Sequence, residues 1–271
     1  MTATRRDTVS DELPPLQSVR LDAIDRVPAG FSIEYRESGS LDAPATICMH
    51  GIGSNATGYR AQLDGLSRTH RVVSWNAPGY GRSDHFSFDP PCVDDYAHAL
   101  AGFLKALNIH KAVVIGSSFG AIIAASFGVH YPDLAQALVL SAPAAGNARH
   151  STQERKAMLD ARIGDIQRLG PEGVADQRCR ALLASTAPEP VIAAAHALVA
   201  AVNPPGYIAA AQVLDQADTV GMAAKIEAAT LVLVGSEDRI TPAQTCARPV
   251  HAALKNAEIV ELQGVGHLIK L

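Results

Sequence analysis

The residues with the clearest chemical potential lie in Gly116-Ser-Ser-Phe-Gly120, where Ser118 is the candidate nucleophile. The β-branched run 111–116 predicts a strand, and the apolar residues 121–128 predict a buried helix. A serine between glycines at such a strand-to-helix corner is the pattern that presents a reactive hydroxyl above a sheet. Gly116 and Gly120 fit this corner because a Cβ at either position would crowd the turn. The motif alone also fits a Gly- and Ser-rich loop without chemistry.

Four further motifs each follow a predicted strand. They are His50-Gly-Ile-Gly53 after 45–49, Ala77-Pro-Gly-Tyr-Gly-Arg-Ser-Asp84 after 71–75, Gly235-Ser-Glu-Asp-Arg-Ile-Thr-Pro242 after 230–234, and Gly264-Val-Gly-His-Leu268 after 258–262. Together with the serine motif, and in this order, they resemble the loops of the α/β-hydrolase superfamily along nearly the whole chain. The resemblance implies an α/β-hydrolase fold, with a mostly parallel eight-stranded sheet, helices on both faces, and a helical cap inserted after the sixth strand.

The resemblance also implies a catalytic triad in the chain order Ser118, Asp238, His267. A serine hydroxyl is a weak nucleophile at neutral pH and needs an adjacent base, which in turn needs an orienting acid. His267 would take the Ser118 proton and later deliver it to the leaving group. Asp238 would fix the tautomer of His267. The backbone N–H groups of Ile52 and Phe119 would form the oxyanion hole.

Alternatives exist for several of these residues. His267 is one of ten histidines and could be an ordinary surface residue, although it follows a strand in a Gly-x-Gly-His setting. Glu237 competes with Asp238 as the acid; the loop spacing favours Asp238 and predicts a solvated Glu237. The segment 142–146 after the sixth strand offers no acid, which also favours Asp238. We expect His50 to be structural.

Glycines complete the predicted supporting loops. Gly51 and Gly53 flank Ile52 in the predicted oxyanion loop, as Gly116 and Gly120 flank the serine pair.

The chain alternates between strand and helix patterns up to about residue 146 and again from 230. Between 147 and 222 only amphipathic helical patterns occur, interrupted by Pro- and Gly-rich breaks. We therefore expect a core formed by 1–146 and 223–271 and a helical cap formed by 147–222. Residues 1–15 are polar, end in Pro14-Pro15 and predict a loose arm.

The function implied by the resemblance is hydrolysis of a small ester or lactone through an acyl-enzyme. The chain resembles small capped enzymes such as 3-oxoadipate enol-lactonases and the carbon–carbon bond hydrolases of aromatic degradation. The latter usually carry Asn before the nucleophile and Trp after the histidine, whereas this chain has Ser117 and Leu268. Carbon–carbon bond hydrolysis, a cofactor-free perhydrolase and a non-catalytic ligand receptor are the alternatives. Arg155 and Arg162 either contact an acidic substrate or belong to solvated helix faces.

The composition favours an ordinary enzyme without cofactor or metal, acting on a small-molecule substrate. The net charge of −4 gives a nucleic-acid partner no electrostatic support. No apolar run is long enough to span a membrane, and residues 1–6 lack the apolar core of a signal peptide. Four cysteines without paired spacing predict free thiols and a cytoplasmic location.

The end of the chain departs from the resemblance. His267 lies four residues from the end of the 271-residue sequence, where relatives continue into a further helix. We expect the missing helix to leave the histidine loop mobile and a sheet flank exposed, which would favour a homodimer.

Overall fold

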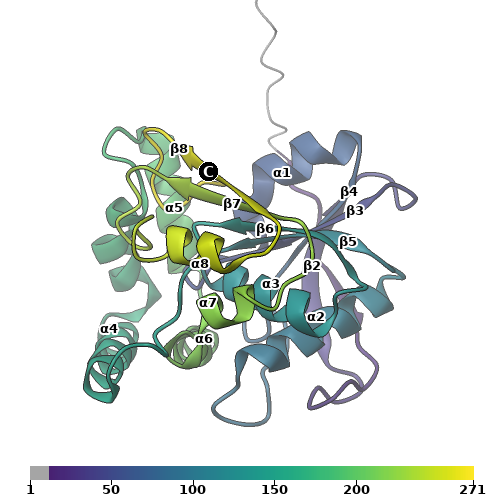
Figure 1. Cartoon of the computed structure of the whole chain (residues 1–271), viewed down its shortest axis with the longest axis horizontal. Coiled ribbons are helices and arrows are strands. Elements are labelled where there is room, and N and C mark those ends of the chain that lie inside the picture. Colours follow the sequence, from purple (N-terminus) through teal and green to yellow (C-terminus); the bar gives the residue numbers. More distant parts are fainter. Residues whose placement is uncertain (1–11) are drawn as a thin grey trace, which may run out of the picture.

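Eight strands form a single sheet at the centre of the computed structural model, which describes residues 12–271 (Figure 1). Their order is β1-β2-β4-β3-β5-β6-β7-β8; β2 is antiparallel to both of its neighbours, and the other pairs are parallel. The strands are β1 Gln17–Arg20, β2 Ser32–Ser38, β3 Ala45–Met49, β4 Arg71–Trp75, β5 Ala112–Ser117, β6 Ala135–Ser141, β7 Thr230–Gly235 and β8 Ala257–Leu262. The predicted mostly parallel eight-stranded sheet is confirmed. The expectations for residues 1–11 lie outside the described residues.

Helices cover both faces of the sheet, as expected. Figure 1 shows α1 on one side and α2 and α3 on the other. The helices are α1 Arg60–Gly65, α2 Val93–Ala106, α3 Phe119–His130, α4 Thr152–Arg178, α5 Glu189–Ala200, α6 Pro204–Gln216, α7 Thr219–Ala223 and α8 Ala247–Ala253, with three short 3-10 helices at Ala56–Tyr59, Leu66–Arg68 and Cys179–Leu182.

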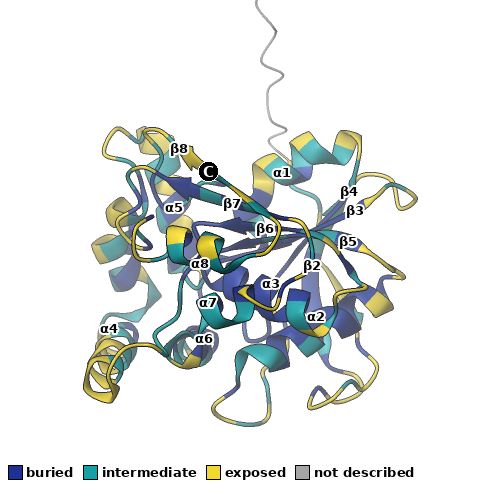
Figure 2. Ribbon diagram, viewed as in Figure 1, coloured by how far each residue is buried: buried dark blue, intermediate teal, exposed yellow. Residues whose placement is uncertain are grey.

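The core is centred on α3, which is buried from Phe119 to Gly128, and on β3 and β4, which are buried throughout (Figure 2). A helix that is apolar on all sides can only be stable inside a protein, and parallel strands covered on both faces read as continuous apolar runs. The sequence of α3 therefore fixes its place beneath the sheet. Its first turn is buried and directly follows Ser118.

The connection between β6 and β7 contains α4 to α7 and, within the described chain, no strand. Gly170 interrupts α4 with φ 66° and ψ 177°, and Pro171 follows it, so α4 consists of two helical pieces joined at a kink. The helical insertion after the sixth strand is thus present where the sequence predicts it.

No single helix in the described part of the chain is long and apolar enough to cross a membrane. Among residues 12–271, α5 and α6 would together be long and apolar enough for a span, but they are bent by 93° at their junction.

Lys270 is a buried lysine that joins two loops of the fold. Its Nζ donates a hydrogen bond to Ser54 Oγ at 3.0 Å and lies 4.6 Å from the ring centre of Tyr59. Ser54 follows the motif that starts at His50, and Lys270 follows His267. Burial lowers the pKa of Lys270 to about 7, because the charged ammonium loses its hydration. The Lys270 side chain therefore connects the loop after β3 with the segment after His267, and its amine is buried in doing so.

This burial predicts an alkaline gain in stability. Between pH 7 and 10.5 the unfolded chain holds a Lys270 proton that the folded chain has released, so the unfolding free energy rises with pH. We expect the unfolding free energy of the wild type minus that of Lys270→Met, both measured by urea unfolding, to rise with pH over this window. The limiting slope is about 1.4 kcal/mol per pH unit. A difference that stays flat would contradict the burial of the amine.

Candidate active site

The candidate residues converge at one edge of the sheet. Strands β3, β5, β7 and β8 are parallel, so the loops at their carboxyl ends meet on the same side. These loops carry Ile52, Ser118, Asp238 and His267, respectively. The fold thus brings residues from distant parts of the chain into one crevice.

Ser118 has the strained backbone that the motif predicts, with φ 55° and ψ −110°. Its own N–H donates to the carbonyl of Ser141 at 2.9 Å, which fixes the corner to β6. A Cβ on Gly116 would lie 2.2 Å from the Gly120 oxygen, and a Cβ on Gly120 would lie 2.2 Å from the Met49 oxygen. Both positions therefore require glycine, and they hold Ser118 where the strand ends and α3 begins.

His267 and Asp238 form a buried pair. Their side chains are 5% and 0% exposed, and His267 Nδ1 lies 2.9 Å from Asp238 Oδ2. Because a carboxylate can only accept here, Nδ1 carries the proton and Nε2 keeps a free lone pair. That lone pair can accept the proton of a nucleophile.

Asp238 is held as an anion by hydrogen bonds. Its Oδ1 accepts from the N–H groups of Ile240 and Thr241, each at 2.9 Å, and its Oδ2 accepts from Thr241 Oγ1 at 2.8 Å. Burial alone raises the pKa of Asp238, but the hydrogen bond and charge of His267, followed by the Thr241 donors, outweigh burial and lower it. The carboxylate can therefore stabilise an imidazolium next to it.

Thr241 is a residue that the sequence reasoning missed. Its Oγ1 lies 2.8 Å from Asp238 Oδ2, 3.1 Å from His267 Nδ1 and 3.1 Å from the carbonyl of Ala142. The hydroxyl thus sits between the acid, the base and the end of β6. The only signal in the sequence was a β-branched hydroxyl residue three positions after Asp238.

The predicted oxyanion loop packs directly against Ser118. A Cβ on Gly51 would lie 3.2 Å from the Ser118 Cβ, and Ile52, Gly53 and Phe119 line the same pocket as Ser118. Within residues 12–271 the structure records no acceptor for the N–H groups of Ile52 and Phe119. Both donors are thus available to a ligand oxygen.

His50 and Tyr80 fix the shape of this loop. His50 Nε2 accepts the N–H of Ala77 at 3.0 Å, so Nδ1 carries the proton and donates to the Gly51 carbonyl at 2.9 Å. Burial lowers the pKa of His50 to about 3, which keeps the ring neutral near pH 7. Tyr80 donates its hydroxyl to the Ile52 carbonyl at 2.9 Å. The two ring nitrogens of His50 are both engaged by backbone groups of neighbouring loops.

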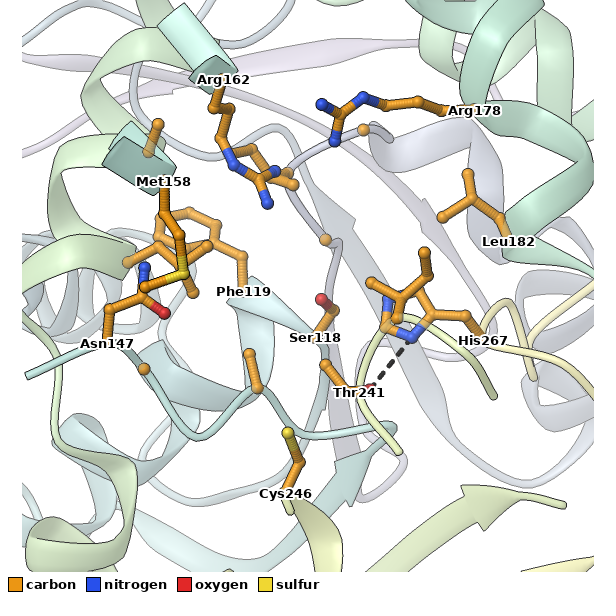
Figure 3. A pocket seen from close by; sticks show the side chains of 18 of the residues that line it. Ser118, Phe119, Asn147, Met158, Arg162, Arg178, Leu182, Thr241, Cys246 and His267 are labelled. Carbon is orange, nitrogen blue, oxygen red and sulfur yellow. Dashed lines mark hydrogen bonds between the residues drawn. The ribbon is translucent and has the colours of Figure 1, made fainter. Parts of the chain in front are cut away.

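A pocket of about 640 Å³ opens above Ser118 (Figure 3). Ser118 and His267 both line it, whereas Asp238, which contacts His267 Nδ1, is not part of its lining. In the described residues the Ser118 hydroxyl has no recorded hydrogen-bond partner. The opposite wall comes from the helical insertion through Met158, Leu159, Arg162, Val174, Arg178, Leu182, Val199, Tyr207, Ala211 and Leu214. No group of three or more His, Cys, Asp or Glu side chains within 12–271 is arranged to hold a metal ion.

Residues 182–185 of the insertion are joined to the acid and histidine loops. The Leu268 N–H donates to the Leu182 carbonyl at 3.1 Å, and a Cβ on Gly266 would lie 2.4 Å from the Leu183 carbonyl carbon. Glu237 Oε2 accepts from both the N–H and the hydroxyl of Ser185, at 2.8 and 2.9 Å. These bonds lower the pKa of Glu237. Glu237 is therefore a structural anchor, and the expectation of a merely solvated side chain missed this contact.

Comparisons with known proteins agree with this architecture. The α/β-hydrolase fold family matches residues 44–271. A 2-hydroxy-6-oxo-6-phenylhexa-2,4-dienoate hydrolase of Comamonas testosteroni is 32% identical over 124 residues, 44% of this chain and 43% of the relative. The first curated relatives are thus matched over about two fifths of their length.

Two solved structures share the fold over nearly the whole chain. An esterase from Thermogutta terrifontis, solved with malate bound, has a TM-score of 0.82 at 23% identity and covers 94% of this chain and 92% of its own. An enol-lactonase from Burkholderia xenovorans has a TM-score of 0.80 at 21% identity and covers 92% of both chains. With the family match over residues 44–271, these likenesses establish that the chain belongs to the α/β-hydrolase fold family.

Proposed function

We propose that this protein is a serine hydrolase that cleaves small esters or lactones through an acyl-enzyme. One observation carries the proposal: Ser118 occupies a strained corner in the wall of the pocket, beside a histidine whose Nδ1 is bound to a buried carboxylate. A free base lone pair in the same pocket as a serine hydroxyl is the arrangement that nucleophilic catalysis requires. The names of the esterase and lactonase with this fold agree with the bond type.

The proposed reaction has two steps. Ser118 Oγ attacks the carbonyl carbon while His267 Nε2 takes the hydroxyl proton, and the N–H groups of Ile52 and Phe119 bind the oxyanion. Collapse of the tetrahedral intermediate breaks the bond to the leaving oxygen, which receives the proton from His267. Water then attacks the acyl carbon while His267 takes its proton. Collapse of the second tetrahedral intermediate breaks the bond to Ser118 Oγ, which receives that proton from His267, and the acid is released. Asp238 stabilises the imidazolium in both steps.

The same proposal assigns a role to the helical insertion. We propose that residues 147–222 form a lid, with 1–146 and 223–271 as the catalytic core. Side chains of α4, α5 and α6 face Ser118 across the pocket, which supports this division. The apolar members of this wall would set the size of the acyl group, because a methylene-scale change in such a pocket is worth about 1–3 kcal/mol.

Hydrolysis of a carbon–carbon bond is the second candidate, because at least four curated relatives carry names of that activity. Three assays on the purified chain separate the candidates: a short-chain p-nitrophenyl ester, the same ester with hydrogen peroxide, and a 2-hydroxy-6-oxo-dienoate. Ester turnover that dominates supports the proposal, and peracid formation would indicate a perhydrolase. If dienoate cleavage dominates, the protein is a carbon–carbon bond hydrolase and the proposal is wrong. If no substrate is turned over, the result favours a non-catalytic ligand receptor.

Ser118→Ala tests the nucleophile. We expect hydrolysis of p-nitrophenyl esters to fall by at least about 10³-fold, since only oxyanion and binding contributions remain. The matched control is Ser117→Ala, one residue away, which should lose less than about tenfold. Thermal melts should show that both variants remain folded. Activity of Ser118→Ala near that of the wild type would refute the assignment.

Asp238→Asn and Glu237→Gln test the choice of acid. The asparagine variant loses the carboxylate that selects the His267 tautomer, so we expect kcat to fall by about 10²–10⁴-fold. The glutamine variant weakens only the contact with Ser185 and should lose less than tenfold. Equal losses, or the reverse order, would show that the acid is misassigned.

Thr241→Val tests the hydroxyl between acid and base. Valine keeps the shape but removes the donor to Asp238, so we expect kcat to fall by about tenfold. Thr241→Ser should restore most of the activity because it restores the hydroxyl. A valine variant as active as the wild type would exclude a positioning role for Thr241.

A further inference from the structure

Arg162 is a pocket arginine without an acidic partner among residues 12–271. It projects from α4 into the pocket, and its recorded contact is a long hydrogen bond of 3.4 Å from Nη1 to the Tyr207 hydroxyl (Figure 3). The other arginine of the pocket wall, Arg178, is paired with Asp165 at 2.8 Å. Arg155, on the same helix, is paired with Asp215 at 2.7 Å. Arg162 thus differs from both neighbours in lacking a counter-charge.

The guanidinium of Arg162 belongs to the same pocket as Ile52 of the predicted oxyanion loop. Tyr207 is 3% exposed and holds one end of the contact. Burial raises the pKa of Tyr80 well above its usual value, and the charge of Arg162 opposes that rise, so the two side chains are close enough to interact. Tyr80 in turn donates to the Ile52 carbonyl. A group bound to Arg162 would therefore lie in the same pocket as Ser118 and His267.

The surroundings of Arg162 favour an anion. The wall of the pocket is mostly apolar, with Met158, Leu182 and Val199 among its members. A cation beside such a surface loses hydration, and the Tyr207 hydroxyl supplies no negative charge to replace it, so an anionic ligand offsets this loss. The planar guanidinium matches a carboxylate with two parallel hydrogen bonds. One uncompensated positive charge balances one carboxylate, whereas a phosphate dianion calls for more.

We propose that Arg162 binds a carboxylate carried by the substrate, so the preferred substrates are esters or lactones of dicarboxylic acids with one free carboxylate. This inference rests on the proposed hydrolase function. The free carboxylate is fixed at Arg162 and the ester carbonyl lies at Ser118, which makes the length of the chain between them a determinant of specificity.

Matched substrates test the selectivity. Mono-p-nitrophenyl esters of succinic, glutaric and adipic acid are compared with analogues in which a neutral carboxamide replaces the free carboxylate. We expect kcat/KM to favour the acid over the amide by at least about tenfold for one chain length, and Arg162→Met to lower that ratio by about 10- to 100-fold. Added salt should lower the ratio in the wild type.

Two variants sharpen the result. Arg162→Lys keeps the charge but loses the bidentate geometry, so its ratio should lie between those of the wild type and Arg162→Met. Arg168→Met removes an exposed charge from the same helix, 64% exposed and outside the pocket, and should leave the ratio unchanged. An equal effect of Arg168→Met would show that the whole field of α4, and not Arg162, selects the anion.

Binding to an inactive protein separates this inference from the proposed function. In a Ser118→Ala background, whichever of the three mono-p-nitrophenyl esters binds most tightly should bind about 10- to 100-fold more weakly after Arg162→Met, measured by calorimetry. Ser118-dependent hydrolysis with an acid-to-amide ratio near one would overturn the Arg162 site and leave the function standing. If no ester is turned over, an unchanged affinity in this binding experiment overturns the site independently, and a weakened affinity supports it.

Discussion

Three backbone segments meet at the corner between β5 and α3 with no space for another side chain. The Met49 carbonyl at the end of β3, the Gly120 backbone and the Gly116 backbone are in direct contact. This packing forces the strained conformation of Ser118. Because Met49 directly precedes His50, it also sets the distance between the serine and the oxyanion loop. The spacing between Ser118 and the loop that carries Ile52 is therefore set by the sheet itself.

The charge states of the buried Asp238 and His50 are set by their hydrogen-bond partners. Asp238 is buried, yet it remains an anion because each of its oxygens accepts two hydrogen bonds. His50 is buried, has no acidic partner among residues 12–271, and stays neutral near pH 7. One histidine next to a carboxylate can take up a proton, and the other, bound to two backbone groups, serves as a fixed spacer. Partners rather than residue type decide the role of each imidazole.

Much of the fold could be predicted from the sequence, because strand ends and their loops are local patterns. The glycines around Ser118 and the Gly-x-Gly-His segment before Leu268 indicate, from the sequence alone, where a strand ends. The contacts of Thr241, Glu237 and Lys270 could not be predicted, because each depends on a partner far away in sequence. A solvated glutamate and one bound to Ser185 look alike in the sequence. Only the tertiary contacts distinguish them.

The helical insertion is joined to the catalytic loops by main-chain contacts at residues 182–185, where Leu182 accepts from Leu268 and Gly266 leaves no room for a side chain. Backbone contacts of this kind do not depend on the sequence of either partner, but they do depend on its local shape. A foreign insertion recombined onto this core could therefore vary widely in its helices and still be accepted. It would have to reproduce the backbone path of residues 182–185. That short stretch, rather than the ends of the insertion, therefore limits which chimeric proteins can fold.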